Sequence, residues 1–135
     1  THAEIHGRIS AFDLGMARMV SARKDCIGQR MAQREGLNGP QREQLVGIRS
    51  SVEFGAGAHL FTTNEPIHRE TSQGYVTSMC WSPTLAEWIG LAFVKDAPNR
   101  HGEVLRLVDH MRSADVQVSL CHPVFFDPEG GKLRA

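Results

Sequence analysis

The stretch Trp81-Ser82-Pro83-Thr84-Leu85 contains side chains that could bind a planar organic ligand. Proline fixes φ and lacks an amide hydrogen, so two strands are expected to meet here in a rigid turn flanked by Trp81 and Trp88. An indole can stack on a planar ring, while the hydroxyls of Ser82 and Thr84 can form hydrogen bonds with it. We therefore consider Trp81, Ser82 and Thr84 as a candidate pocket rim. The alternative is that both tryptophans simply pack in the core and at its edge.

A metal site is the second chemistry to consider. His2, Glu4 and His6 would point to the same side of an extended segment, where they could act as metal ligands. No cysteine or further carboxylate nearby completes the site, and an exposed polar tail explains these residues equally well. No metal is therefore predicted.

The segment Gly55-Ala56-Gly57-Ala58-His59-Leu60 is only superficially like a dinucleotide-binding loop. Leu60 stands where the third glycine of that motif belongs, and no long helix is expected to follow. The two glycines are expected instead to allow a tight turn or bulge that leads into a strand at His59.

The remaining acids and histidines are dispersed, so none is predicted to be catalytic. His59 and His122 are in settings expected to be partly buried, with hydrogen bonding as their role. Solvated positions are expected for the acids Glu70, Glu87, Asp109, Asp115, Asp127 and Glu129.

Composition limits the classes of partner. The 15 Lys and Arg residues balance 15 Asp and Glu residues, so the formal net charge is zero. Nucleic-acid binding needs a basic face that neutralises phosphates, so no nucleic-acid partner is expected. No apolar run approaches the roughly 20 residues that cross a bilayer, so we expect a soluble protein without a membrane partner.

The chain of 135 residues has the length of one domain. Because it starts at Thr1, without an initiator methionine, we expect it to be a piece of a longer protein. Cys26, Cys80 and Cys121 are odd in number and far apart, without a Cys-x-x-Cys pair. We expect reduced, mostly buried thiols in a cytoplasmic protein.

Two segments follow from the pattern of apolar and turn-forming residues. Residues 1–40 are predicted to form an extended lead-in and one short helix, followed by a β domain over 41–135. The helix is predicted over Cys26 to Glu35, because Asp25 is a favourable N-cap and Gly36 is a residue type that commonly ends helices. Ile27 and Met31 would form its apolar face.

Short strands separated by turns dominate after residue 40. Val116, Val118 and Leu120 alternate with polar residues, which predicts a strand with one face in the core. The continuously apolar run from Ile89 to Val94 predicts a strand covered on both faces. Further strands are expected near 45–48, 59–61 and 74–80. This spacing predicts a mainly β fold, either an antiparallel barrel or a sandwich, and a closed barrel avoids exposed edges.

Several of these runs together resemble the carboxy-terminal barrel of the aminomethyltransferase (glycine-cleavage T-protein) superfamily, and within it the alpha subunits of heterotetrameric sarcosine oxidases. The similarity covers essentially the whole chain. Cys26 and Ala86 depart from it, where Phe and Gly are common, and both are interpreted as packing changes. The runs are Asp13-Leu14-Gly15, Lys24 to Gly28, Gly74 to Ser78, Trp81 to Leu85, Ile89 to Ala92 and His122 to Gly130.

The resemblance implies a larger enzyme in which a flavin oxidises sarcosine and the one-carbon unit reaches tetrahydrofolate. It also implies an NAD-binding region, other domains of the alpha subunit and further subunits as partners. None of the flavin, NAD or catalytic residues is expected in this chain, which would be inactive alone. Its expected share is one side of the folate cavity, with Trp81, Ser82 and Thr84 at the rim.

Two alternatives remain at this point. The first is the equivalent barrel of a glycine-cleavage aminomethyltransferase or of a dimethylglycine oxidase relative. The second is a non-catalytic assembly module without a ligand.

Overall fold

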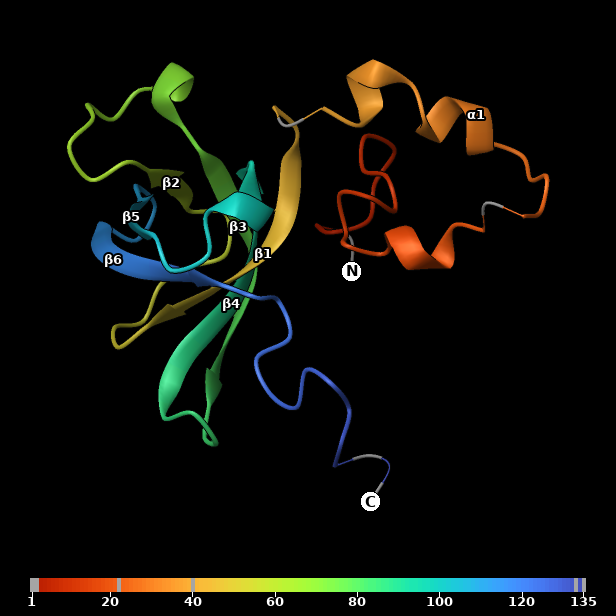
Figure 1. Ribbon diagram of the computed structural model, residues 1–135. Helices are drawn as coiled ribbons and strands as arrows, with labels where there is room; N and C mark the ends of the chain where they lie inside the picture. Colours follow the sequence, from red (N-terminus) through yellow and green to blue (C-terminus); the bar gives the residue numbers. More distant parts are fainter. Residues whose placement is uncertain (1–2, 22, 40, 133, 135) are drawn as a thin grey trace.

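The computed structural model describes residues 3–21, 23–39, 41–132 and 134. Its main feature is a closed antiparallel barrel with the strand order β1-β4-β3-β2-β5-β6 (Figure 1). The barrel confirms the predicted fold class, and all six strands fall within the predicted segment 41–135. The strands are β1 (Glu43–Ser50), β2 (His59–Phe61), β3 (Gly74–Ser82), β4 (Glu87–Lys95), β5 (Val104–Asp109) and β6 (Ala114–Cys121).

The barrel interior is filled by aliphatic side chains that alternate along the strands. On β6, Val118 and Leu120 are buried, whereas Gln117 and Ser119 are exposed, as the alternating pattern predicts. β-branched and leucine side chains dominate because they pack well between pleated surfaces. The core consists of Val46, Ile48, Phe54, Ala58, Leu60, Val76, Ala92, Val94, Ala97, Leu105, Leu107, Val118 and Leu120.

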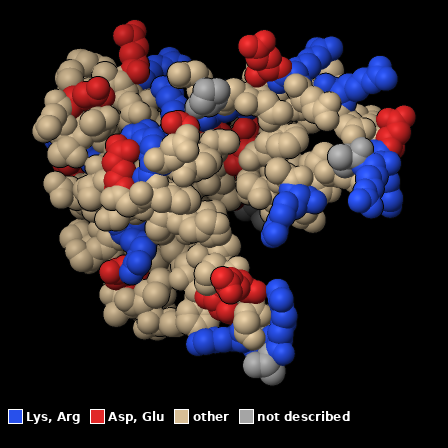
Figure 2. Space-filling model, viewed as in Figure 1, with Lys and Arg blue, Asp and Glu red and all other residues tan. Residues whose placement is uncertain are grey.

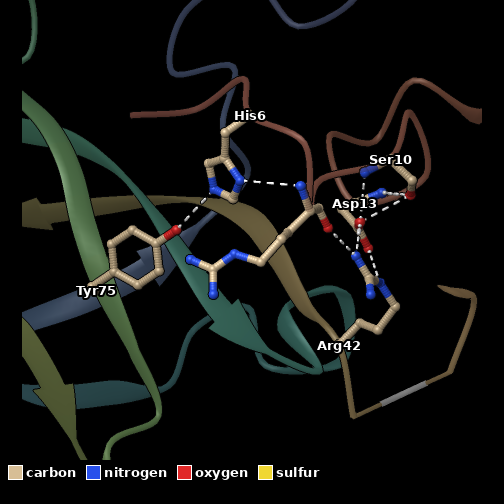
Figure 3. Close-up of polar contacts among 6 residues, drawn as sticks. His6, Ser10, Asp13, Arg42 and Tyr75 are labelled. Carbon is tan, nitrogen blue, oxygen red and sulfur yellow. Dashed lines mark hydrogen bonds and ion pairs between the residues drawn. The ribbon is translucent and has the colours of Figure 1, made fainter. Parts of the chain in front are cut away.

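Strand β4 is covered on both faces over part of its length. Ala92 and Val94 belong to the barrel core, while Phe93 between them is also fully buried and points away from that core. The ring of Tyr75 on β3 lies 5.9 Å from the Phe93 ring, centroid to centroid. The Tyr75 hydroxyl in turn lies 3.5 Å from Nε2 of His6, which brings the lead-in over this outer face (Figure 3).

The lead-in folds in turns and short helical segments rather than as extended chain. It contains two single-turn 3-10 helices, η1 (Ala17–Met19) and η2 (Glu35–Leu37), with α1 (Gln29–Ala32) between them. Two further 3-10 helices, η3 (Arg69–Thr71) and η4 (Ala97–Asn99), lie in barrel loops. In the described part of the chain, no helix combines the length and the apolar composition needed to cross a membrane.

The bounds predicted for the helix, Cys26 to Glu35, are wrong. α1 starts only after Gly28, which has a left-handed backbone with φ of 90°, so Asp25 does not cap it. Gly36 lies inside η2 instead of ending the helix. The apolar face predicted for this helix has no surface to pack on, since Ile27 is fully exposed, and short helices gain most of their stability from such packing.

An ion pair joins the lead-in to the barrel. Nε of Arg42 donates to Oδ1 of Asp13 at 2.8 Å, and Nη2 of Arg42 lies 2.5 Å from Oδ2 (Figure 3). Oδ2 also accepts from the amide and the hydroxyl of Ser10, at 2.8 and 2.9 Å. The Asp13 carbonyl accepts from the amide of Leu45 on β1 at 2.7 Å. Asp13 is thus buried, and both carboxylate oxygens and its carbonyl oxygen accept hydrogen bonds.

The cysteines are free thiols, but the expected burial is wrong for Cys26 and Cys80. Cys26 is exposed in the lead-in, two residues before Gly28, and Cys80 is exposed on the β3–β4 hairpin. Only Cys121 is partly buried, and this burial raises the pKa of its thiol.

Candidate functional site

The candidate site lies on the hairpin formed by β3 and β4, which extends beyond the rest of the barrel (Figure 1). Trp81 and Trp88 are opposite each other in the strand register. Their rings meet edge to face, with centroids 5.6 Å apart and an interplanar angle of 68°. Trp88 packs against the barrel core, whereas 46% of Trp81 is exposed. The inner indole therefore supports an outer one that has a free surface.

Alternation along β3 places Trp81 on the same side as Met79, which also packs against the core. Trp81 thus continues the inner face of the sheet past the end of the barrel. Ser82 follows on the opposite face, and its Oγ accepts a hydrogen bond from the Leu85 amide at 3.3 Å, which closes the turn. Thr84 is exposed in the turn. Of the three predicted rim residues, the structure therefore leaves Trp81 and Thr84 exposed and uses the Ser82 hydroxyl locally.

The backbone in the turn of this hairpin explains why glycine is common in the family at the position of Ala86. Its φ is +52°, in the left-handed region that glycine adopts without steric cost. The interpretation of Ala86 as a packing change is therefore wrong: a glycine at this position relieves the backbone rather than the core.

A polar groove of about 570 Å³ lies beside the turn end of the hairpin, next to Glu87. Arg49 of β1 and Glu87 of β4 face it, with Arg49 Nε 2.7 Å from Glu87 Oε2. The rest of its polar lining consists of Ser50, Ser51, Gln117, Ser119 and Cys121. The sequence analysis predicts only a solvated position for Glu87 and does not identify Arg49. Only the alternation of Arg49 with the buried Ile48 and Ser50 could have indicated an outward guanidinium here.

Asp109 is buried, so its predicted solvated position is wrong. Its Oδ1 accepts from the amides of Met111 and Arg112, and its Oδ2 accepts from Arg112 Nη1 at 2.8 Å. The hydrogen bond from Arg112 holds the pKa of Asp109 below its ordinary value. This cluster also explains why residue 55 is a glycine, because a Cβ there would lie 2.4 Å from Asp109 Oδ2.

Gly57 confirms the predicted turn before β2, since its φ is +87°. His59 and His122, expected to be partly buried, are both exposed. Each still has the expected hydrogen bond: Nδ1 of His59 lies 3.1 Å from Ser72 Oγ, and Nδ1 of His122 accepts from the Val124 amide at 3.1 Å.

The described residues contain no group of three or more His, Cys, Asp or Glu side chains placed to hold a metal ion. His2 lies outside the described residues. Glu4 and His6 have partners within the protein: a hydrogen bond with Thr77 lowers the pKa of Glu4, and His6 contacts the Tyr75 hydroxyl.

Comparison with known proteins agrees with this architecture. Residues 44–127 match the family model of the glycine cleavage T-protein C-terminal barrel domain. The chain is 42% identical over 138 residues to the sarcosine oxidase subunit alpha of Rhizobium meliloti (strain 1021). It is 36% identical over 131 residues to that of Corynebacterium sp. (strain U-96).

These alignments cover 99% and 93% of this chain, but the chain spans only 14% and 13% of the length of the two relatives. The family match includes every strand of the closed barrel in whole or in part. The chain therefore belongs to the glycine cleavage T-protein C-terminal barrel domain family.

Proposed function

We propose that this chain is the barrel domain of a sarcosine oxidase alpha subunit and forms one side of a tetrahydrofolate cavity. The parent enzyme oxidatively demethylates sarcosine to glycine and transfers the one-carbon unit to tetrahydrofolate. The observation that carries this proposal is the 42% identity to a sarcosine oxidase alpha subunit over 99% of the chain.

The exposed hairpin supports a ligand-facing role. Trp81 is about half exposed and is held in place by its edge-to-face contact with Trp88. Its free face suits the pterin ring of a folate, and the exposed Thr84 offers a hydroxyl nearby in the turn. In this proposal the flavin and the NAD carry the redox chemistry. They and the catalytic residues belong to other parts of the parent. The unpaired thiols suit a reducing cytoplasm.

A second candidate rests on the family model, whose description names the glycine cleavage T-protein. In that case the barrel belongs to an aminomethyltransferase, and the parent transfers a one-carbon unit without oxidising sarcosine. The named relatives favour the sarcosine oxidase assignment.

Two measurements on the chain alone test the proposal that the site is completed by other domains. Incubation with sarcosine is expected to give no peroxide, and NADH is expected to remain unoxidised. Calorimetry is expected to show tetrahydrofolate binding no tighter than about 1 mM, or roughly −4 kcal/mol, because most contacts of a site between domains are missing. Peroxide formation or micromolar folate binding by this chain would contradict the proposal.

A further inference from the structure

Strand β3 contains a β-bulge, where Thr77 and Ser78 together face Leu91 of β4. Val76 pairs with Ala92 before the bulge and Ser78 pairs with Leu91 after it, so Thr77 is the extra residue. A bulge bends its strand and increases the local twist. Bulges are common beside functional sites, where they change the direction of a side chain.

The extra residue determines the face on which Trp81 lies. Val76 and Trp81 are separated by an odd number of residues, which in a regular strand places two side chains on opposite faces. The bulge shifts this alternation by one residue, so Val76, Met79 and Trp81 all lie on the inner face. A regular ladder over the same sequence would turn Trp81 to the outer face, away from Trp88.

The side chain of the extra residue is buried and bonded. Thr77 is 8% exposed, and its Oγ1 donates to the carbonyl of Leu91 at 3.1 Å. The carboxylate of Glu4 in the lead-in also has a hydrogen bond with Thr77, which lowers the pKa of Glu4. A hydroxyl has one hydrogen, which two acceptors can share. Thr77 therefore connects the lead-in, β3 and β4 at one point.

Gly90 of β4 allows the two strands to approach closely at the bulge. A Cβ at this position would lie 2.6 Å from the Ser78 carbonyl oxygen and 2.9 Å from Cε2 of Phe54. Phe54 is buried and belongs to the barrel core. The bulge thus lies directly against Gly90, and Gly90 against the Phe54 ring, which leaves β3 little room to straighten.

Beyond the bulge, the position of Trp81 depends on how β3 leaves it. β1 pairs with β4 as far as Trp88, so β4 has a neighbour on each side. The other edge of β3 is bonded only as far as Val76, and no described strand pairs with it further on. Residues 81–86 carry no charge, and the tip of the hairpin, at the lower left of Figure 2, is mainly tan. Neither a further strand nor an ion pair of the turn therefore orients Trp81.

We propose that Thr77 is a positioning residue for the tetrahydrofolate site. As the extra residue of the bulge, it places Trp81 on the inner face beside Trp88, and its buried hydroxyl fixes the direction in which the hairpin leaves the barrel. This inference rests on the proposed function and deepens it, because it names the element that sets the position of the ligand-facing indole.

The test uses the complete assembly with a full-length alpha subunit and measures tetrahydrofolate binding by calorimetry. Thr77→Val keeps the shape of the side chain but removes its hydroxyl, and it is expected to raise the dissociation constant about fivefold. Thr77→Ser restores the hydroxyl and is expected to remain within about twofold of wild type. Thr71→Val is the matched control, because it removes a hydroxyl that donates to the Pro66 carbonyl at 2.7 Å, before the start of β3. It should also remain within about twofold.

A double-mutant cycle with Trp81→Ala shows whether Thr77 acts through Trp81. Trp81→Ala alone is expected to raise the dissociation constant about tenfold. Adding Thr77→Val should raise it less than about twofold further, because the indole that Thr77 positions is already gone. A purely structural effect of Thr77→Val would instead multiply with that of Trp81→Ala. Flavin reduction by sarcosine at the wild-type rate verifies that each variant is assembled.

Gly90→Ala tests the bulge from the opposite strand, and it replaces Thr77→Val in the cycle if that variant does not assemble. The new Cβ would press against the Ser78 carbonyl, so the same weakening and the same dependence on Trp81 are expected. Gly36→Ala is the matched control, because nothing lies within 4 Å of a Cβ there.

An unchanged dissociation constant in Thr77→Val overturns the positioning role, as does equal weakening by the Thr71 control. Full weakening by Thr77→Val in the Trp81→Ala background also overturns it. Unchanged folate affinity in Trp81→Ala alone refutes the proposed function, and the positioning role with it. Weakened binding in Trp81→Ala with wild-type affinity in Thr77→Val overturns only the positioning role.

Discussion

Asp13 and Arg42 form a buried two-point ion pair between segments 29 residues apart, with Arg42 Nε 2.8 Å from Asp13 Oδ1. Asp13 is 2% exposed and Arg42 is 21% exposed, so the carboxylate depends on this partner. The pair is the main polar link between the lead-in and the barrel.

Asp13→Asn should therefore destabilise the chain by about 2 kcal/mol, because it leaves the guanidinium partly buried without its counter-ion. Urea unfolding measures this loss. The Leu45 amide, which donates to the Asp13 carbonyl, should also exchange its hydrogen faster. Asp25→Asn is the control and should change stability by less than about 0.5 kcal/mol, since Asp25 is exposed.

The same pair predicts an acid-dependent loss of stability. Burial would raise the pKa of Asp13, but the hydrogen bonds from Arg42 and Ser10 outweigh it and hold the pKa below its ordinary value of 3.8. A lowered folded-state pKa gives stability that is complete above the ordinary value and lost as the pH falls through the folded-state value. The stability difference between wild type and Asp13→Asn should thus be constant from about pH 7 to pH 5 and shrink below about pH 4. A difference that stays constant down to pH 3 would contradict this.

The two faces of β6 give a matched pair of substitutions. Val118→Asp should cost more than about 3 kcal/mol, because it buries a carboxylate in the core without a partner. Gln117→Asp should be nearly silent, since Gln117 is exposed. Thermal unfolding of both variants measures the contrast. Similar shifts in Tm for the two would show that the strand faces are assigned wrongly.

The hairpin turn offers a stabilising change. Ala86→Gly should raise the free energy of unfolding by about 1 kcal/mol, because it relieves the left-handed backbone at φ of +52°. Ala114→Gly in β6 should instead lower it by about 0.5 to 1 kcal/mol, because glycine costs more entropy in a regular strand. Chemical denaturation of both variants measures these values, and a loss of stability in Ala86→Gly would refute the conformational explanation.

Local patterns predicted five of the six strands but not β5, and they left a barrel and a sandwich open until the family resemblance indicated the barrel. The alternation of Val116, Val118 and Leu120 determines which face of β6 is buried, because the side-chain period of a strand leaves no choice. The prediction of the helix bounds was wrong for a different reason. Its pattern of Ile27 and Met31 is local, but helix length depends on a surface to pack against, which the sequence pattern does not contain.

Several of the contacts that the sequence did not reveal join distant segments. Arg49 and Glu87 lie 38 residues apart and meet only because β1 pairs with β4. Asp109 looks like a turn residue in the sequence, yet the folding of Gly55 against it removes it from solvent. Trp81 was identified as a rim candidate from its turn, although its face on the sheet required the register.

Folate binding and flavin reduction in a full-length alpha subunit carrying Trp81→Ala test the proposed function most directly. Phe126→Ala is the control, because Phe126 is an exposed aromatic residue outside the hairpin. With Trp81→Ala, the dissociation constant of tetrahydrofolate should rise about tenfold, while flavin reduction by sarcosine in the complete assembly should stay near the wild-type rate. An unchanged folate affinity would contradict the rim role and return Trp81 to a packing residue.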